Sequence, residues 1–85
     1  MKKVTIYTGD LCIHCDSAKD LLNRKNIQFI EYNVAKDISK REEMLKKCNG
    51  ARTVPQIFIG DQHVGGNAEL QKLDREGKLD SLVSI

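Results

Sequence analysis

Two cysteines separated by two residues are the most reactive feature of this 85-residue sequence. Cys12 follows a short run of strand-forming residues and stands where a helical pattern begins, and Cys15 lies one turn further on. At a helix N-terminus, unpaired backbone N–H groups and the positive end of the helix dipole favour a thiolate over a thiol. Because a thiolate is the species that attacks disulfides, we predict that Cys12 is a nucleophile and Cys15 a resolving thiol.

A metal site is the main alternative for this pair of cysteines. Zinc sites usually add a second close pair of cysteines or histidines, which this sequence lacks. A small metal-binding module that uses Cys12, His14 and Cys15 stays open as an alternative. The spacing favours thiol–disulfide chemistry, for which we expect neither a metal nor a bound cofactor.

The composition points away from several other classes of protein. Fourteen basic and twelve acidic residues leave a net charge of +2 at pH 7, which is too balanced for a dedicated nucleic-acid binder. No apolar run approaches the roughly 18 residues of a membrane span, and the first residues do not resemble a signal peptide. The odd number of cysteines is untypical of a structural disulfide framework. We therefore expect a cytoplasmic monomer that binds neither nucleic acid nor membranes.

Strand and helix patterns alternate along the chain and predict its fold. The expected strands lie at 4–7, 27–34, 56–60 and 62–64. The first expected helix runs from Cys12 to between Asn23 and Asn26, the second from Asp37 or Ser39 to Cys48, and the third over 67–76. A final turn is expected after Asp80. The first two strands must be parallel with a right-handed crossover, and the last two form an antiparallel hairpin. The order β-α-β-α-β-β-α predicts an α/β fold, a thioredoxin-like, four-stranded mixed sheet flanked by three helices.

The third cysteine belongs to the second predicted helix. Ile38, Leu45 and Cys48 share the apolar stripe of this helix, so we expect Cys48 to be a buried core residue. A regulatory thiol is the alternative.

Two further features give weaker signals. Pro55 follows Thr53-Val54 and opens the third strand, where it is either a plain strand-entry residue or part of a cis peptide bond that exposes the Val54 backbone to an extended peptide. Gly65-Gly66 precedes the last helix, whose first N–H groups are able to bind a carboxylate, although a plain turn produces the same pattern.

Together these features resemble the glutaredoxin family, and especially its small bacterial dithiol members, over essentially the whole chain. The resemblance rests on Tyr7-Thr8, Cys12-Ile13-His14-Cys15, Thr53-Val54-Pro55-Gln56-Ile57-Phe58 and Gly65-Gly66. It implies a single glutaredoxin domain over residues 1–85 that reduces protein disulfides and glutathione mixed disulfides through the Cys12/Cys15 dithiol. Glutathione would be a co-substrate, kept reduced by an NADPH-dependent glutathione reductase.

The resemblance also implies a glutathione-binding surface. The Val54 backbone, before a cis Pro55, would hydrogen-bond the cysteinyl part of glutathione, and the start of the last helix would receive the γ-glutamyl carboxylate. The full set of glutathione-binding residues that it implies is His14, Arg41, Thr53, Val54, Pro55, Gly66, Asn67 and Ala68.

Departures from the family pattern affect this surface. Gly9 stands where the family usually has a lysine, so Arg41 or Arg52 is expected to supply the positive charge. Ala68 has no side chain to bind the γ-glutamyl ammonium, which implies weaker glutathione affinity or a substitute contact from Glu69.

The motif itself also departs from the family pattern. His14 replaces a tyrosine that in the family forms a wall of the glutathione-binding groove. The histidine either takes over that role as a wall or, when protonated, favours the Cys12 thiolate. Ile13 replaces a proline. Family members that hold an iron–sulfur cluster between two chains often lack that proline, so a cluster scaffold that uses Cys12 of each chain and two glutathione thiols is an alternative function.

Overall fold

The computed structural model describes residues 2–84. Its elements are β1 (Val4–Thr8), α1 (Ile13–Arg24), β2 (Ile30–Asn33), α2 (Ile38–Lys47), β3 (Gln56–Ile59), β4 (Gln62–Gly65), α3 (Asn67–Arg75) and α4 (Leu79–Ser84). The strands form one sheet in the order β2-β1-β3-β4, with β1 parallel to β2 and antiparallel to β3, and with β3 antiparallel to β4. The predicted thioredoxin-like mixed sheet is confirmed, and the described residues add a fourth helix.

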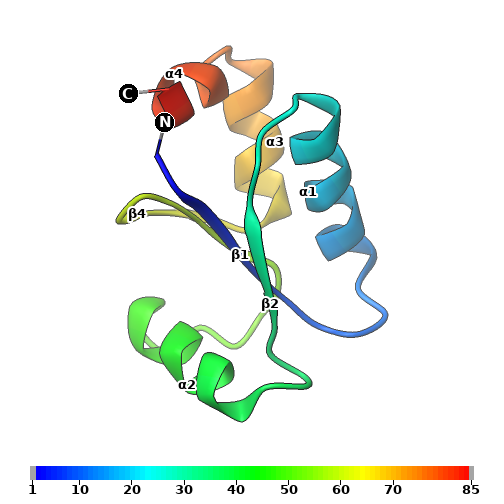
Figure 1. Cartoon of the computed structure of the whole chain (residues 1–85), viewed down its shortest axis with the longest axis vertical. Coiled ribbons are helices and arrows are strands. Elements are labelled where there is room, and N and C mark those ends of the chain that lie inside the picture. Colours follow the sequence, from blue (N-terminus) through cyan, green and yellow to red (C-terminus); the bar gives the residue numbers. More distant parts are fainter. Residues whose placement is uncertain (1, 85) are drawn as a thin grey trace.

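Each face of the sheet has its own core, because successive side chains of a strand point to opposite faces. Ile6 of β1 packs with Leu21 of α1 and Leu70 of α3. The next residue, Tyr7, packs on the other face with Met44 of α2. Helices α1, α3 and α4 therefore lie on one side of the sheet and α2 on the other (Figure 1).

Side-chain caps and left-handed residues set the bounds of the helices. The Cys12 Sγ accepts a hydrogen bond from the Cys15 N–H at the start of α1, and an Asp37 carboxylate oxygen accepts one from the Lys40 N–H at the start of α2. A residue with positive φ follows the end of three helices: Asn26, Asn49 and Gly77, with φ of 58°, 55° and 70°. The asparagines and this glycine are the residue types that adopt such a conformation most readily.

Two predicted elements differ from the structure. The strand expected at 27–34 covers only Ile30–Asn33, because the Ile27 N–H is bonded to the end of α1 and its side chain is buried under that helix. The turn expected after Asp80 is part of helix α4. Leu79 and Val83, four residues apart, are buried together, and this spacing places them on one helical face.

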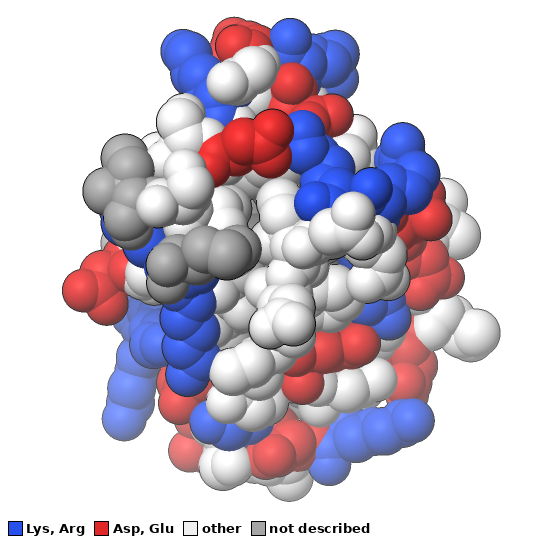
Figure 2. All heavy atoms as spheres, turned by 45° about the horizontal axis from the view of Figure 1, so that its top comes forward, with Lys and Arg blue, Asp and Glu red and all other residues white. Residues whose placement is uncertain are grey.

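Acidic and basic side chains are mixed on the surface. On the face shown in Figure 2, blue and red side chains are interspersed around an uncharged area. Some charged side chains of the protein form ion pairs: the Arg24 guanidinium lies 3.0 Å from Asp20, and the Lys25 ammonium lies 2.9 Å from Asp74 and 3.1 Å from Asp80. Within residues 2–84, no helix has the length and apolar character needed to cross a membrane.

The buried face of α2 differs in part from its prediction. Ile38 is 75% exposed, and Met44 is the helical side chain that fills the core. Cys48 is buried, as predicted, at the end of this helix. Its burial raises the pKa of the thiol, and the neighbouring Lys47 charge opposes only part of that rise.

We predict that the Cys48 thiol reacts more slowly with iodoacetamide than the free thiol of glutathione, because burial shields the sulfur and keeps it protonated. The rate is measured in a Cys12→Ser/Cys15→Ser variant, in which Cys48 is the only cysteine left in the sequence. Unfolding that variant in urea should bring the rate close to that of glutathione. Equal rates in native buffer would instead identify an accessible, regulatory thiol.

Candidate active site

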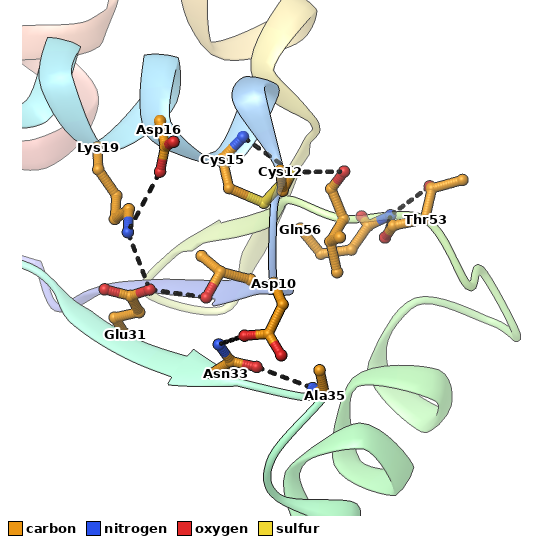
Figure 3. The surroundings of a disulfide bond; sticks show 12 residues. Asp10, Cys12, Cys15, Asp16, Lys19, Glu31, Asn33, Ala35, Thr53 and Gln56 are labelled. Carbon is orange, nitrogen blue, oxygen red and sulfur yellow. Dashed lines mark hydrogen bonds and ion pairs between the residues drawn. A yellow bond between two sulfur atoms is a disulfide. The ribbon is translucent and has the colours of Figure 1, made fainter.

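A disulfide joins Cys12 and Cys15 at the junction of β1 and α1 (Figure 3). Their Cα atoms are 5.2 Å apart, and Cys15 is 1% exposed whereas Cys12 is partly accessible. The Cys15 N–H donates to the Cys12 Sγ over 3.1 Å. The accessible sulfur therefore faces the N-terminus of a helix, where a negative charge on sulfur is stabilised.

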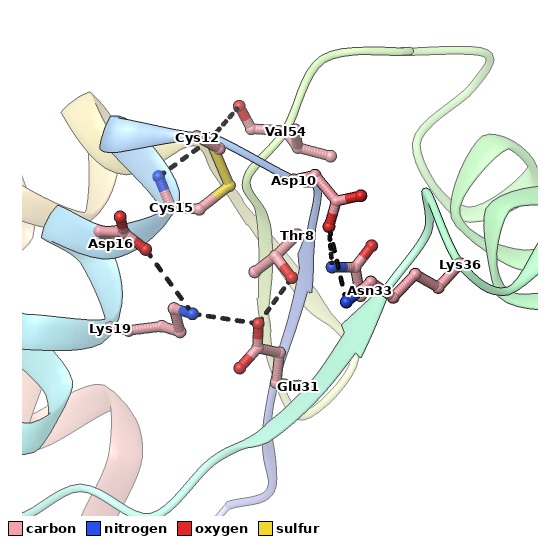
Figure 4. A network of polar contacts seen from close by, with 10 residues as sticks. All are labelled: Thr8, Asp10, Cys12, Cys15, Asp16, Lys19, Glu31, Asn33, Lys36 and Val54. Carbon is pink, nitrogen blue, oxygen red and sulfur yellow. Dashed lines mark hydrogen bonds and ion pairs between the residues drawn. A yellow bond between two sulfur atoms is a disulfide. The ribbon is translucent and has the colours of Figure 1, made fainter.

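Val54 lies opposite Cys12 on the loop that leads into β3 (Figure 4). The Val54–Pro55 peptide bond is cis, which is the second of the two alternatives considered for Pro55. The Val54 carbonyl oxygen lies 3.8 Å from the Cys12 Sγ. In the disulfide this sulfur carries no proton, so the approach is a contact; a reduced Cys12 thiol has a proton to donate to the same oxygen.

A cleft of about 220 Å³ lies next to Val54, the residue that contacts this sulfur. It is lined by His14, Thr53, Val54, Pro55, Gly66, Asn67, Ala68 and Glu69. Every residue in the predicted glutathione-binding set except Arg41 therefore lines one cleft. These residues come from the start of α1, the loop before β3 and the start of α3, three segments that are distant in the sequence.

The start of α3 forms one wall of the cleft. One of the backbone N–H groups there already has a hydrogen-bond acceptor within the protein. The Gly66 N–H donates to a Glu69 carboxylate oxygen over 2.7 Å. Gly65 has a φ of 116°, a backbone conformation that residues with a side chain rarely adopt, which is why glycine suits this position. The Gly66 N–H is therefore bonded to Glu69. The next backbone N–H groups at the start of the helix are those of Asn67 and Ala68.

A second cleft, of about 200 Å³, lies on the other side of Val54. Its lining includes Gly9, Arg41, Arg52 and Val54. Both arginines proposed to replace the family lysine thus lie beside the position where that lysine is missing. A Cβ atom at Gly9 would come within 3.2 Å of a Val54 methyl group, so a side chain at this position would press on the loop that faces Cys12.

An ion-pair network holds α1 against β2 beside the disulfide (Figure 4). The Lys19 ammonium lies 3.1 Å from Glu31 and 3.8 Å from Asp16. The Thr8 hydroxyl donates to the same Glu31 oxygen over 2.7 Å. This hydrogen bond, helped by Lys19, holds the pKa of Glu31 below its usual value. The positive charge of Lys19 is therefore largely compensated within the network.

The loop that carries Cys12 is fixed at one point and exposed at another. The Asn33 amide donates to an Asp10 carboxylate oxygen over 2.9 Å and thereby ties the loop to the end of β2. Leu11 and Ile13, on either side of Cys12, are 103% and 77% exposed.

The alternative of a metal-binding module gains no support from the structure. Within residues 2–84, no three or more histidine, cysteine, aspartate or glutamate side chains are grouped so that they could hold a metal ion.

Gln56 is a buried polar residue that is not among the predicted glutathione-binding residues. It is 5% exposed and donates hydrogen bonds to Thr53. The sequence feature that could have indicated a buried polar residue is the position of Gln56, directly before the apolar run Ile57-Phe58-Ile59.

Comparisons with known proteins agree with this geometry. The sequence profile of the Glutaredoxin family matches residues 4–64. Glutaredoxin 3 of Escherichia coli K12 is 47% identical over 83 residues, which cover 98% of this chain and 99% of that protein. The solution structure of a glutaredoxin from Brucella melitensis has a TM-score of 0.83 at 47% identity, and it covers 98% of this chain and 89% of that one. A dithiolic glutaredoxin from Trypanosoma brucei brucei has a TM-score of 0.84 at 34% identity, covering 98% and 88%.

We predict that His14→Tyr lowers the fraction of reduced Cys12 that is thiolate at neutral pH and makes the cysteine pair more reducing, by tens of millivolts at most on the scale of such effects. A protonated imidazole next to Cys12 stabilises the thiolate, and a tyrosine only fills the same space. The thiolate is measured by its ultraviolet absorbance and the potential by equilibration with glutathione buffers.

His14→Gln is the control for this prediction, because it removes the imidazole without placing another ring in the cleft. Its thiolate fraction should match that of His14→Tyr. An unchanged thiolate fraction in both variants would leave His14 as a wall of the cleft alone.

Proposed function

Because this chain belongs to the glutaredoxin family of thiol–disulfide oxidoreductases, we propose that it uses glutathione to reduce protein disulfides and mixed disulfides of proteins with glutathione. The observation that carries the proposal is the cleft beside Cys12, in which seven of the eight residues expected to bind glutathione meet. Glutathione is a co-substrate in this proposal, and an NADPH-dependent glutathione reductase regenerates it.

Reduction of a glutathione mixed disulfide requires two exchange steps at Cys12. The Cys12 thiolate attacks the glutathione sulfur; a bond between these sulfurs forms, and the protein substrate leaves as a thiolate that takes up a proton. The thiolate of a second glutathione then attacks the bound glutathione sulfur. Oxidised glutathione leaves, and the Cys12 thiolate is restored.

Reduction of a protein disulfide needs both cysteines. Cys12 first forms a mixed disulfide with one sulfur of the substrate. The Cys15 thiolate then attacks Cys12, the substrate leaves fully reduced, and the Cys12–Cys15 disulfide forms. Two glutathione molecules reduce this disulfide. The burial of Cys15 within the first turn of α1 suits a thiol that acts within the molecule.

Each end of glutathione has a group in the two clefts that complements it. The first N–H groups of α3 at Asn67 and Ala68 suit the γ-glutamyl carboxylate, because helix N-termini bind anions. The Val54 backbone suits the cysteinyl part, since it faces Cys12. Arg41 or Arg52 suits the glycyl carboxylate, with Val54 lining both clefts.

The setting of the protein follows from the same proposal. We place it in the cytoplasm, where thiols are kept reduced, as a monomer with a single domain of residues 1–85. Its partners are glutathione and proteins that carry disulfides or bound glutathione.

We predict that Cys12→Ser abolishes thiol transfer and that Cys15→Ser retains it toward a glutathione mixed disulfide but not toward protein disulfides. Only Cys12 is both accessible and at the helix N-terminus, and only the second reaction needs an intramolecular attack. NADPH consumption, coupled through glutathione reductase, measures both activities. Cys48→Ala is the matched control and should keep both. Normal turnover by Cys12→Ser, or equal loss in Cys15→Ser toward both substrates, would contradict the proposal.

We predict that Arg41→Ala or Arg52→Ala raises the KM for the glutathione mixed disulfide about two- to fivefold, as expected for an exposed charge pair. The effect should shrink as salt is added, because salt screens exposed charges. Arg24→Ala is the control, since Arg24 pairs with Asp20 on the exposed surface of α1. If neither cleft arginine changes the KM more than Arg24 does, another group binds the glycyl carboxylate.

A further inference from the structure

A chain of hydrogen bonds centred on the buried Gln56 runs from β4 to the loop before β3. The Gln56 Nε2 lies 2.9 Å from the Thr53 carbonyl oxygen and 3.1 Å from the Thr53 Oγ1 (Figure 3). On its other side, the Gln56 Oε1 lies 2.7 Å from the His63 Nε2. Gln56 is buried and His63 is exposed, so the chain links the surface of the sheet to the lining of the cleft.

The direction of these hydrogen bonds follows from what each group is able to do. A backbone carbonyl oxygen only accepts, so the amide nitrogen of Gln56 must face Thr53. The amide oxygen of Gln56 then faces His63 and also only accepts. The proton in that bond must therefore be on the His63 Nε2, which donates to Gln56.

This direction determines what the Thr53 hydroxyl is able to do. One amide hydrogen of Gln56 goes to the Thr53 carbonyl oxygen and the other to the Thr53 Oγ1. Because the Oγ1 accepts from Gln56, its own hydrogen points away from Gln56. Thr53 lines the cleft beside Cys12, so its hydroxyl is left as a hydrogen-bond donor to a group bound there.

His63 is itself held in place. Its ring stacks on Phe58 with the ring centroids 4.7 Å apart and the planes at 18°. Phe58 belongs to the core beneath α2 and pairs with His63 across the β3–β4 hairpin. The orientation of the Gln56 amide is therefore supported from the core.

We propose that Gln56, held by His63, is a positioning residue that makes the Thr53 hydroxyl a donor to an oxygen acceptor of the glutathionyl substrate, a carboxylate or an amide carbonyl. The proposal rests on the proposed function, in which glutathione occupies this cleft. Gln56 itself acts through Thr53 rather than by touching the substrate.

The test is a double-mutant cycle between Gln56 and Thr53. Gln56→Met keeps the shape of the side chain but removes its donors, and Thr53→Val removes the hydroxyl. Each single change should raise the KM for a glutathionylated peptide about fivefold with kcat unchanged, as for the loss of a contact made equally in the ground and transition states. The double variant should show a rise well below the product of the two. Effects that multiply would overturn the proposal, because Gln56 would then act independently of Thr53.

Matched variants separate positioning from loss of structure. Gln62→Met makes the same change at an exposed site on β4 and should leave the KM unchanged. His63→Phe keeps an aromatic ring on Phe58 but removes the donor to Gln56, and its KM should rise by less than that of Gln56→Met. Urea unfolding of each variant establishes that the kinetics come from folded protein. An unchanged KM in folded Gln56→Met would refute the proposal.

A second substrate distinguishes this inference from the proposed function. A mixed disulfide of the same peptide with cysteamine lacks both carboxylates and both amide carbonyls of glutathione. If the wild-type protein reduces the two substrates equally well, the proposed glutathione function fails. If the wild type prefers the glutathionylated peptide and Gln56→Met prefers it to the same degree, only the role of Gln56 fails.

Discussion

The hydrogen bond from the Cys15 N–H to the Cys12 Sγ links the fold of this protein to its chemistry. A helix N-cap residue normally accepts such a bond through a side-chain oxygen; here a sulfur atom takes that place. The start of α1 and the electrostatic environment of the sulfur therefore depend on one geometry. A shift of the helix start by one residue would remove both the cap and the stabilisation of a thiolate. The contacts of Thr8, Glu31 and Lys19 that hold α1 against the sheet protect this arrangement.

The pairing of β1 with β3 brings the second half of the site to the sulfur. These strands are antiparallel, with Tyr7 opposite Gln56. The last residues of β1 and the first residues of β3 therefore lie side by side at the same end of the sheet. The loop before β3 consequently places Val54 against Cys12. The hairpin from β3 to β4 then returns the chain to that end of the sheet, where α3 begins at Asn67. The cleft is thus a product of strand order, and its three walls need not be close in sequence.

Features set by neighbouring residues could be predicted from the sequence, and features set by packing could not. The cap at Cys12 and the helix end at Gly77 follow from local residue types and spacing. The bond between Gln56 and His63 depends on the register of β3 with β4, which is irregular between Ile57 and Phe58. No local pattern reports that register. The position of Arg41 on the far side of Val54 similarly depends on how α2 packs against the sheet.

Gly9 shows how a lost charge and a close contact are connected at this site. A Cβ atom at this position would lie 3.2 Å from a Val54 methyl group, so glycine lets that methyl group pack against the backbone before Cys12. A lysine at this position would bring a cation there, and the Val54 methyl group would have to shift by a few tenths of an ångström to admit it. Arg41 and Arg52 line the same cleft as Gly9 and Val54. Both arginines therefore place positive charge in the lining of this cleft, while Gly9 leaves the Val54 methyl group in contact with the backbone before Cys12.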